Sequence, residues 1–298
     1  MSKRRTCFVI NCMNQQVRTV MKCRIDTMML PGILLLGVCA GWGIHVASAA
    51  DAVQSTGSCI SHAGEPVQLF GVHEIELPAP DLGDLNPWTG VTLTVEFTRP
   101  DGSKAVVDGF FDGGQMFNAR AYCDRVGKWT WRSASSLESL DGRSGSFAVI
   151  DSKLPGKLRK HPDDSRQFVR DDGTWFLHIG DTGYRYVTAT EPEWKAYIDQ
   201  SAKMGATKVR TWFCQGRNDV QVLFTEDRKG LNLPYWQEID RRLCYALDAH
   251  PGVVFQVIPY GEDTEELLRY DKDPMSRLIA RYAQARFSAL ANVTWCVS

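Results

Sequence analysis

The chain has 298 residues, of which 44% are hydrophobic and 23% charged, so it is long enough for two domains with separate cores. Its formal net charge is −1, but the first 49 residues hold six basic residues and one acidic residue, which leaves 28 basic and 34 acidic residues in the remainder. A mildly acidic body lacks the basic surface that nucleic-acid binding requires, so the composition argues against nucleic acid as a partner.

Residues 1–49 have the pattern of a secretory signal peptide. A basic region precedes the apolar run Ile33–Ala40, and the small-residue segment Val46–Ala49 follows it. We therefore expect cleavage at the end of this segment and a secreted or periplasmic protein. A membrane anchor is the alternative, but Gly41 and Gly43 interrupt the run before the roughly 18 apolar residues that a span needs. No stable membrane span is expected after cleavage.

Residues 50–64 are small and polar and indicate a flexible lead-in, whereas residues 65–152 predict an antiparallel β-sandwich. Runs of alternating hydrophobicity such as Val91–Thr98 are separated by turn signals such as Arg99–Gly102. The expected strands are residues 67–77, 91–98, 104–111, 116–122, 127–132 and 144–150.

Trp129 and Trp131 lie on one face of a predicted strand in this region. Two exposed rings at that spacing could stack on a sugar. Packing within the core is the favoured interpretation, because large aromatic residues are mostly buried.

Five cysteines lie outside the signal segment, an odd number at wide spacing: Cys59, Cys123, Cys214, Cys244 and Cys296. Neither a disulfide framework nor the ligand spacing of a zinc site emerges from them. We expect them to serve as small buried hydrophobic residues, and the sequence predicts no metal and no cofactor.

A linker at residues 153–166 separates the β region from residues 167–298, where helices and strands alternate. A hairpin over residues 167–174 leads into Trp175–Thr182, an apolar run that ends in Gly-Asp-Thr and favours a strand buried on both faces. His178 within it is expected to be a core histidine. Helices are predicted at residues 190–205, 235–249 and 274–290, and strands at residues 207–214, 253–260 and 292–297.

This alternation predicts a parallel sheet. A doubly wound dinucleotide-binding fold is one candidate, but Gly180–Gly183 lacks the glycine spacing that pyrophosphate binding needs. The 134 residues after Asp164 suffice for about four β/α units, against roughly 250 residues for a complete barrel. The predicted fold is therefore multidomain, with a β-sandwich followed by the first half of a (β/α)8 TIM barrel.

Polar and aromatic residues follow the C-terminal ends of the predicted parallel strands, which converge on one mouth in a barrel. They are Asp181, Arg210, Trp212, Tyr260, Glu262 and Asp263. Carboxylates and a guanidinium bind hydroxyl groups and aromatic rings stack on sugar faces, so the set favours a carbohydrate substrate. Asp181 could equally form a turn, and Glu262 with Asp263 could be the acidic first turn of a helix.

Both regions resemble known families. Residues 65–152 resemble the β-sandwich module of unknown function found ahead of many secreted glycoside hydrolases, through Gly109–Gly114 and Gly127–Arg132. The remainder resembles the apiosidase-like (β/α)8 barrels of the retaining glycosidase clan. The motifs that carry this second resemblance are Phe176–Thr182, Lys208–Trp212 and Asn292–Ser298.

The resemblance implies that Arg210 helps to hold a nucleophilic carboxylate, that the acid/base lies just after the fourth strand and that the nucleophile follows the seventh. Both positions fall after Ser298. Retaining hydrolysis needs two carboxyl groups about 5–5.5 Å apart. We therefore expect the N-terminal portion of a secreted glycoside hydrolase acting on oligo- or polysaccharides, inactive as it stands. The alternatives are a carbohydrate- or partner-binding β-sandwich protein without catalysis, and a polysaccharide lyase or another non-hydrolytic barrel.

Overall fold

The computed structural model describes residues 58–80, 82–214, 217–259 and 274–296. The chain divides into two compact units, Met1–Ala52 and Val53–Ser298, and everything below concerns the second. The predicted signal peptide and most of the predicted lead-in lie outside the described residues. Among the described residues, no helix has the length and apolar character needed to cross a membrane.

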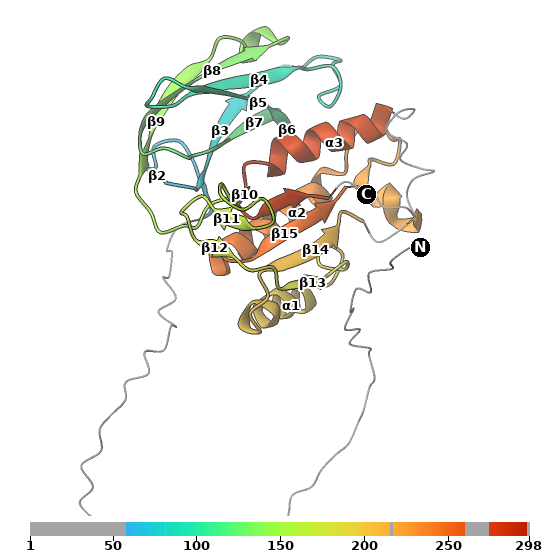
Figure 1. The fold of residues 1–298 in the computed structure, drawn as a ribbon. Helices are drawn as coiled ribbons and strands as arrows, with labels where there is room; N and C mark the ends of the chain where they lie inside the picture. Colours follow the sequence, from blue (N-terminus) through green and yellow to red (C-terminus); the bar gives the residue numbers. More distant parts are fainter. Residues whose placement is uncertain (1–57, 81, 215–216, 260–273, 297–298) are drawn as a thin grey trace, which may run out of the picture. The chain divides into compact units, whose positions relative to one another are not determined.

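Nine short strands in the first part of this unit form two sheets that share one core (Figure 1). The first sheet has the order β1(Ile60–Ser61), β3(Val72–Pro78), β7(Met116–Tyr122) and β6(Phe110–Gly113). The second has the order β2(Val67–Gln68), β9(Ser144–Ile150), β8(Gly127–Ser135), β4(Leu93–Thr98) and β5(Lys104–Asp108). A short 3-10 helix, η1(Glu138–Leu140), connects β8 to β9. On β4 every second residue is buried in the shared core, as the alternating pattern predicts.

Three features of these sheets differ from the prediction. The sheets are mixed, because β1 runs parallel to β3 and β2 runs parallel to β9. These two-residue strands are too short to give a sequence signal. The predicted strand at residues 67–77 also divides at Phe70, which has a φ of 66°, and the halves join different sheets. The predicted strand at residues 104–111 divides at Gly109, where a Cβ would lie 2.4 Å from the Leu93 side chain.

A three-stranded antiparallel sheet follows, made of β10(Leu158–Lys160), β11(Phe168–Arg170) and β12(Trp175–Phe176). The pairing of β11 with β12 is the hairpin that the Asp-Asp-Gly turn predicts. Strand β10 lies within the segment that the sequence suggests is a linker.

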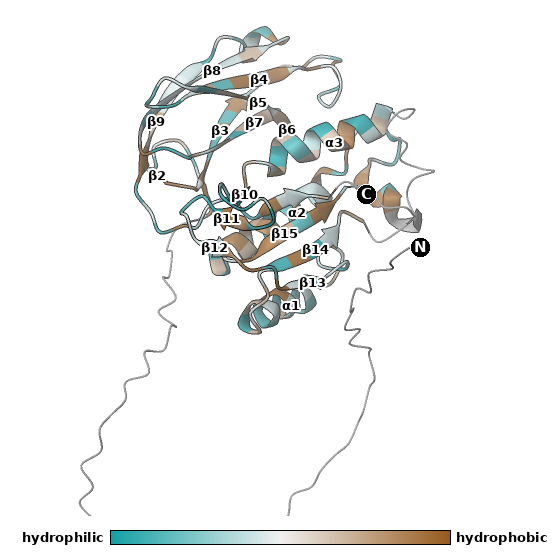
Figure 2. Cartoon of the chain, viewed as in Figure 1, coloured by the Kyte–Doolittle hydropathy of each residue, from teal (hydrophilic) through white to brown (hydrophobic). Residues whose placement is uncertain are grey.

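The last part is a curled, half-barrel-like sheet of four parallel strands with helices on one face (Figure 1). Its strands are β13(Gly180–Thr182), β14(Lys208–Trp212), β15(Val254–Ile258) and β16(Val293–Trp295), paired in sequence order. The helices are α1(Glu191–Lys203), α2(Leu233–Ala249), α3(Pro274–Phe287) and the 3-10 helix η2(Arg217–Leu223). Figure 2 shows hydrophobic residues along β15, which lies between β14 and β16 and is almost entirely buried.

Local signals explain where the helices begin. At α1 the Glu193 carboxylate accepts a hydrogen bond from the backbone N–H of Thr190, at 3.0 Å, and Pro192 occupies the first turn. Trp194 and Ile198 then lie on the buried face of the helix. The predicted helix–strand order is therefore correct for this part of the chain.

The opening parallel strand is not buried on both faces, and this prediction was wrong. Trp175–Thr182 divides into β12 and β13, and the exposed fractions of Trp175, Leu177 and Ile179 are 60%, 47% and 46%. Within the described residues β13 pairs only with β14, so it is an edge strand and one side is uncovered. His178 is likewise exposed and not a core residue; its ring contacts those of Phe168 and Phe176.

A buried ionic network joins the first sheet to helices α2 and α3. Arg120 on β7 donates two hydrogen bonds to Asp240 on α2, at 2.8 and 2.6 Å, and one to Glu74 on β3, at 2.6 Å. Arg286 on α3 donates to Asp240 at 3.0 Å and to Asp112 on β6 at 2.6 Å. Both guanidinium groups are almost fully buried, so these carboxylates compensate charges that would otherwise be very costly.

None of the five cysteines among the described residues forms a disulfide bond. Cys123 and Cys214 are buried, as expected of small hydrophobic residues, and burial raises the pKa of Cys123 to about 12. The thiols of Cys59 and Cys244 contact each other, and this contact together with burial holds the pKa of Cys244 well above its ordinary value.

Asp248 on α2 is expected to make the stability of the fold depend on pH. Burial raises its pKa to about 6, although the backbone N–H of Cys59 bonds the carboxyl and opposes the shift. A raised folded pKa contributes stability below the unfolded value near 4, and that stability is lost as pH rises through 6. Asp248→Asn should therefore be more stable than the parent at pH 7.5, by about 1–2 kcal/mol because water screens part of the effect.

Urea denaturation between pH 3.5 and 8 measures the difference in unfolding free energy between Asp248→Asn and the parent. This difference should vanish at pH 3.5. Asp227→Asn is the matched control, because Asp227 is exposed and hydrogen-bonds only within its own turn. A stabilisation by Asp248→Asn of the same size at every pH would contradict the assignment.

Candidate functional site

One face of the parallel sheet is polar and the other is buried under helices. On β14, Val209 and Thr211 are about 1% exposed or less, while Lys208, Arg210 and Trp212 alternate with them and are half-buried. Side chains in register on adjacent parallel strands share a face. The open face therefore carries one row across all four strands, consisting of Thr182, Arg210, Gln256 and Thr294.

Arg210 occupies the centre of this row. Its Nη2 lies 3.9 Å from the Sγ of Cys296, just after β16, and its buried Nε has no hydrogen-bond partner among the described residues. Within the described residues no carboxylate pairs with it. A guanidinium has five N–H donors, and Cys296 is the one hydrogen-bond acceptor that the described part of the chain gives to the Arg210 side chain.

Trp212 lies at the C-terminal end of β14, two residues after Arg210 and on the same face of the sheet. Its ring lies 4.7 Å from the ring of Tyr184, centroid to centroid, at an interplanar angle of 35°. The indole Nε1 is buried and has no hydrogen-bond partner in the part of the chain that the structure describes. Tyr184 follows β13 by two residues and sequence reasoning missed it, although its place after the Gly-Asp-Thr-Gly turn is a usable signal.

Asp181 lies in a different row from Arg210, because its register partner on β14 is Val209. Its Oδ2 accepts a hydrogen bond from the hydroxyl of Tyr197 on α1 at 2.9 Å, and burial together with this carboxylate raises the pKa of that tyrosine. Gly183 permits the contact, since a Cβ there would lie 2.6 Å from the Tyr197 ring. The structure therefore directs Asp181 toward the helix and does not bring it to Arg210.

A cavity of about 360 Å³ adjoins this end of the sheet. It is lined by Thr182–Tyr186 and by Ala189, Glu193, Trp194 and Tyr197. The aromatic lining suits a ligand with apolar faces and a few polar groups. The other predicted site residues, Tyr260, Glu262 and Asp263, lie outside the described residues.

The tryptophan pair on β8 does not form an exposed platform. Trp129 is only 1% exposed, and its Nε1 donates to the backbone oxygen of Arg125 at 2.8 Å. Trp131 is half-buried and packs over Gly145, where a Cβ would lie 2.8 Å from the indole. Core packing, the favoured interpretation, is correct for Trp129.

Comparisons with known proteins place the fold. A family model described as a domain of unknown function, DUF5060, matches residues 66–136. A search of curated proteins finds no match. Among solved structures, a putative glycoside hydrolase from Bacteroides vulgatus is 19% identical with a TM-score of 0.68, and the match covers 78% of this chain and 49% of that one.

Two other solved structures are less similar. A family 5 glycoside hydrolase from Bacteroides vulgatus is 17% identical with a TM-score of 0.37, over 49% of this chain and 34% of that one. A β-glucuronidase from Faecalibacterium prausnitzii is 12% identical with a TM-score of 0.28, over 77% and 34%. The first similarity shows that the chain has a glycoside-hydrolase-like fold and spans about half the length of that structure.

Proposed function

We propose that this chain is the N-terminal portion of a secreted glycoside hydrolase, and that the open face of its parallel sheet binds oligo- or polysaccharide. In this proposal residues 1–49 are a signal peptide, residues 50–64 a lead-in and residues 65–152 an accessory β-sandwich. Residues 153–166 are a linker, and residues 167–298 are the first half of an apiosidase-like (β/α)8 barrel. The match to a glycoside-hydrolase fold supports the class.

The observation that carries the proposal is the combination of Arg210 and Trp212 on one face of the sheet. Arg210 is half-buried and pairs with no carboxylate among the described residues, and in such a setting a hydrogen bond to a hydroxyl or carboxylate contributes more than it does in water. Trp212 and Tyr184 offer an aromatic surface beside it. Stacking beside hydrogen-bond donors is a common way to hold a polyhydroxylated ring.

The proposal places the two hydrolytic carboxylates outside residues 1–298. Arg210 then has the role of holding the nucleophilic carboxylate, as the resemblance to retaining glycosidases implies. The 298-residue chain should bind saccharide without cleaving it, because retaining hydrolysis requires an acid/base and a nucleophile about 5–5.5 Å apart. Turnover of nitrophenyl glycosides above the buffer rate would contradict this assignment.

Affinity electrophoresis through gels that contain xylan, mannan, pectin or soluble cellulose tests the binding site. The parent chain should be retarded by at least one polysaccharide, and Trp212→Ala should weaken that binding about tenfold, or about 1.4 kcal/mol. Trp175→Ala is the matched control, since Trp175 is a largely exposed tryptophan outside the open face. Binding that survives Trp212→Ala but is lost in Trp131→Ala would instead locate the saccharide on the N-terminal sheets.

A further inference from the structure

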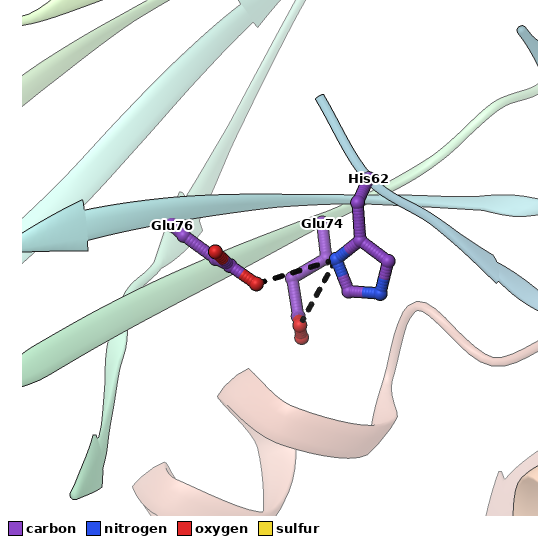
Figure 3. A group of neighbouring side chains, drawn as sticks. All are labelled: His62, Glu74 and Glu76. Atoms are coloured by element: carbon purple, nitrogen blue, oxygen red, sulfur yellow. Dashed lines mark ion pairs between the residues drawn. The ribbon is translucent and has the colours of Figure 1, made fainter. Parts of the chain in front are cut away.

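A histidine and two glutamates come together at the first sheet (Figure 3). Strand β1 pairs in parallel with β3, with Ser61 opposite His73, so His62 arrives beside Glu74. Glu74 and Glu76 are two residues apart on β3 and share a face. The Nδ1 of His62 lies 3.4 Å from Oε1 of Glu76 and 3.9 Å from Oε1 of Glu74.

Glu74 is held in one orientation by a hydrogen bond to its carboxylate. Its side chain is 6% exposed, and its Oε2 accepts a hydrogen bond from Nε of Arg120 at 2.6 Å. Arg120 is in turn fixed by its two hydrogen bonds to Asp240. The other oxygen, Oε1, points toward His62, and no donor among the described residues hydrogen-bonds to it. A buried carboxylate with one oxygen anchored and one oxygen available has the arrangement of a metal ligand with its supporting shell.

The net negative charge of this region also favours binding of a cation. The linked ionic network contains two guanidinium groups and four carboxylates, from Arg120, Arg286, Glu74, Glu76, Asp112 and Asp240. With His62 neutral, the group therefore carries an excess of two negative charges. A divalent cation at His62 would balance that excess, whereas protonation of His62 would balance only half of it.

We propose that His62, Glu74 and Glu76 bind a divalent transition-metal ion, with Zn²⁺ as the preferred ion. All three ligand atoms lie within 4.8 Å of one another, so small side-chain rotations would bring them to the roughly 3–4 Å separation of ligand atoms that lie about 2.0–2.2 Å from a common Zn²⁺. An imidazole nitrogen beside two carboxylates favours zinc over calcium, which prefers six to eight oxygen ligands. The site fastens the strand β1 onto β3, and through Glu74 it reaches the ionic network that continues to α2 and α3.

Metal-dependent protection of His62 tests the proposal on the untagged 298-residue chain. Diethyl pyrocarbonate modification, mapped by mass spectrometry, should slow at least about fivefold at His62 in the presence of Zn²⁺ and remain unchanged at the exposed His178. Isothermal titration with ZnCl₂ should show one fewer binding equivalent in His62→Ala and in Glu76→Gln than in the parent. His178→Ala should keep the parental stoichiometry, and CaCl₂ should give no protection of His62.

Protection has to be measured at His62 itself, because the N-terminal cysteines of the chain can bind zinc independently. Glu76→Gln retains the shape of the side chain and Glu76 is exposed, so this variant should fold like the parent, as thermal denaturation without metal verifies. Equal modification of His62 with and without saturating Zn²⁺ would overturn the proposal, as would an unchanged number of zinc equivalents in both variants. Protection by Ca²⁺ as strong as by Zn²⁺ would overturn the choice of ion.

Discussion

Replacing Asp240 by alanine is expected to destabilise the folded chain by about 3–5 kcal/mol. Asp240 accepts three hydrogen bonds, two from Arg120 and one from Arg286, and its side chain is 9% exposed. Removing the carboxylate leaves two buried guanidinium groups facing each other with less compensation. Their mutual repulsion and their lost hydrogen bonds both act against the folded state.

Urea denaturation at pH 7 measures this effect, and Glu191→Ala provides the control. Glu191 also pairs with two cations, Lys195 and Arg241, but all three side chains are largely exposed, so its loss should cost less than about 1 kcal/mol. If the two variants were destabilised equally, the network would not hold the sheet and the helices together.

The same residue should make the stability of the parent sensitive to acid. Burial by itself would raise the pKa of Asp240, but Arg120 and Arg286 outweigh it and hold the pKa below the ordinary value. A depressed folded pKa contributes stability that is present above the unfolded value near 4 and is lost as pH falls through the folded value. The gap between the parent and Asp240→Ala should therefore narrow below pH 4.

The helices and the parallel strands could be predicted because their signals are local. Thr190 with Glu193 defines the start of α1, and the run from Lys208 to Trp212 alternates as a strand with one buried face should. The same alternation sets Arg210 on the face opposite to Val209 and Thr211, and in the structure Arg210 lies on the open face.

The rest depended on partners that lie far apart in the sequence. Arg120 and Asp240 are 120 positions apart, and neither residue has a local pattern that marks it as part of a buried network. Strand register determines which side chains share a row with Arg210. A shift of one residue in the pairing of β13 with β14 would reverse the face that Asp181 occupies. The proximity of His62 and Glu74 could not be predicted from the sequence for the same reason, since it depends on a parallel strand only two residues long.

Trp129→Ala is the second substitution with a large expected effect, a loss of about 3–5 kcal/mol of stability. The indole is stacked on Phe147 at 5.8 Å, lies under the guanidinium of Arg99 at 5.3 Å and is anchored through Arg125. Truncation would open a large cavity between the two N-terminal sheets. Trp131→Ala should cost less, about 1–2 kcal/mol, because that ring is half-buried.

Measuring stability and saccharide binding on the same variants separates a packing role from a binding role. A tryptophan that serves as a sugar platform is exposed in the free protein, so its removal weakens binding and changes the unfolding free energy little. Removal of a core tryptophan instead lowers the unfolding free energy and leaves binding unchanged. At a temperature where Trp129→Ala is still folded, its retardation in polysaccharide gels should therefore equal that of the parent. If Trp129→Ala unfolded like the parent but no longer bound polysaccharide, the two N-terminal sheets would open in solution to expose that ring. The saccharide site would then belong to those sheets and not to the face that carries Arg210 and Trp212.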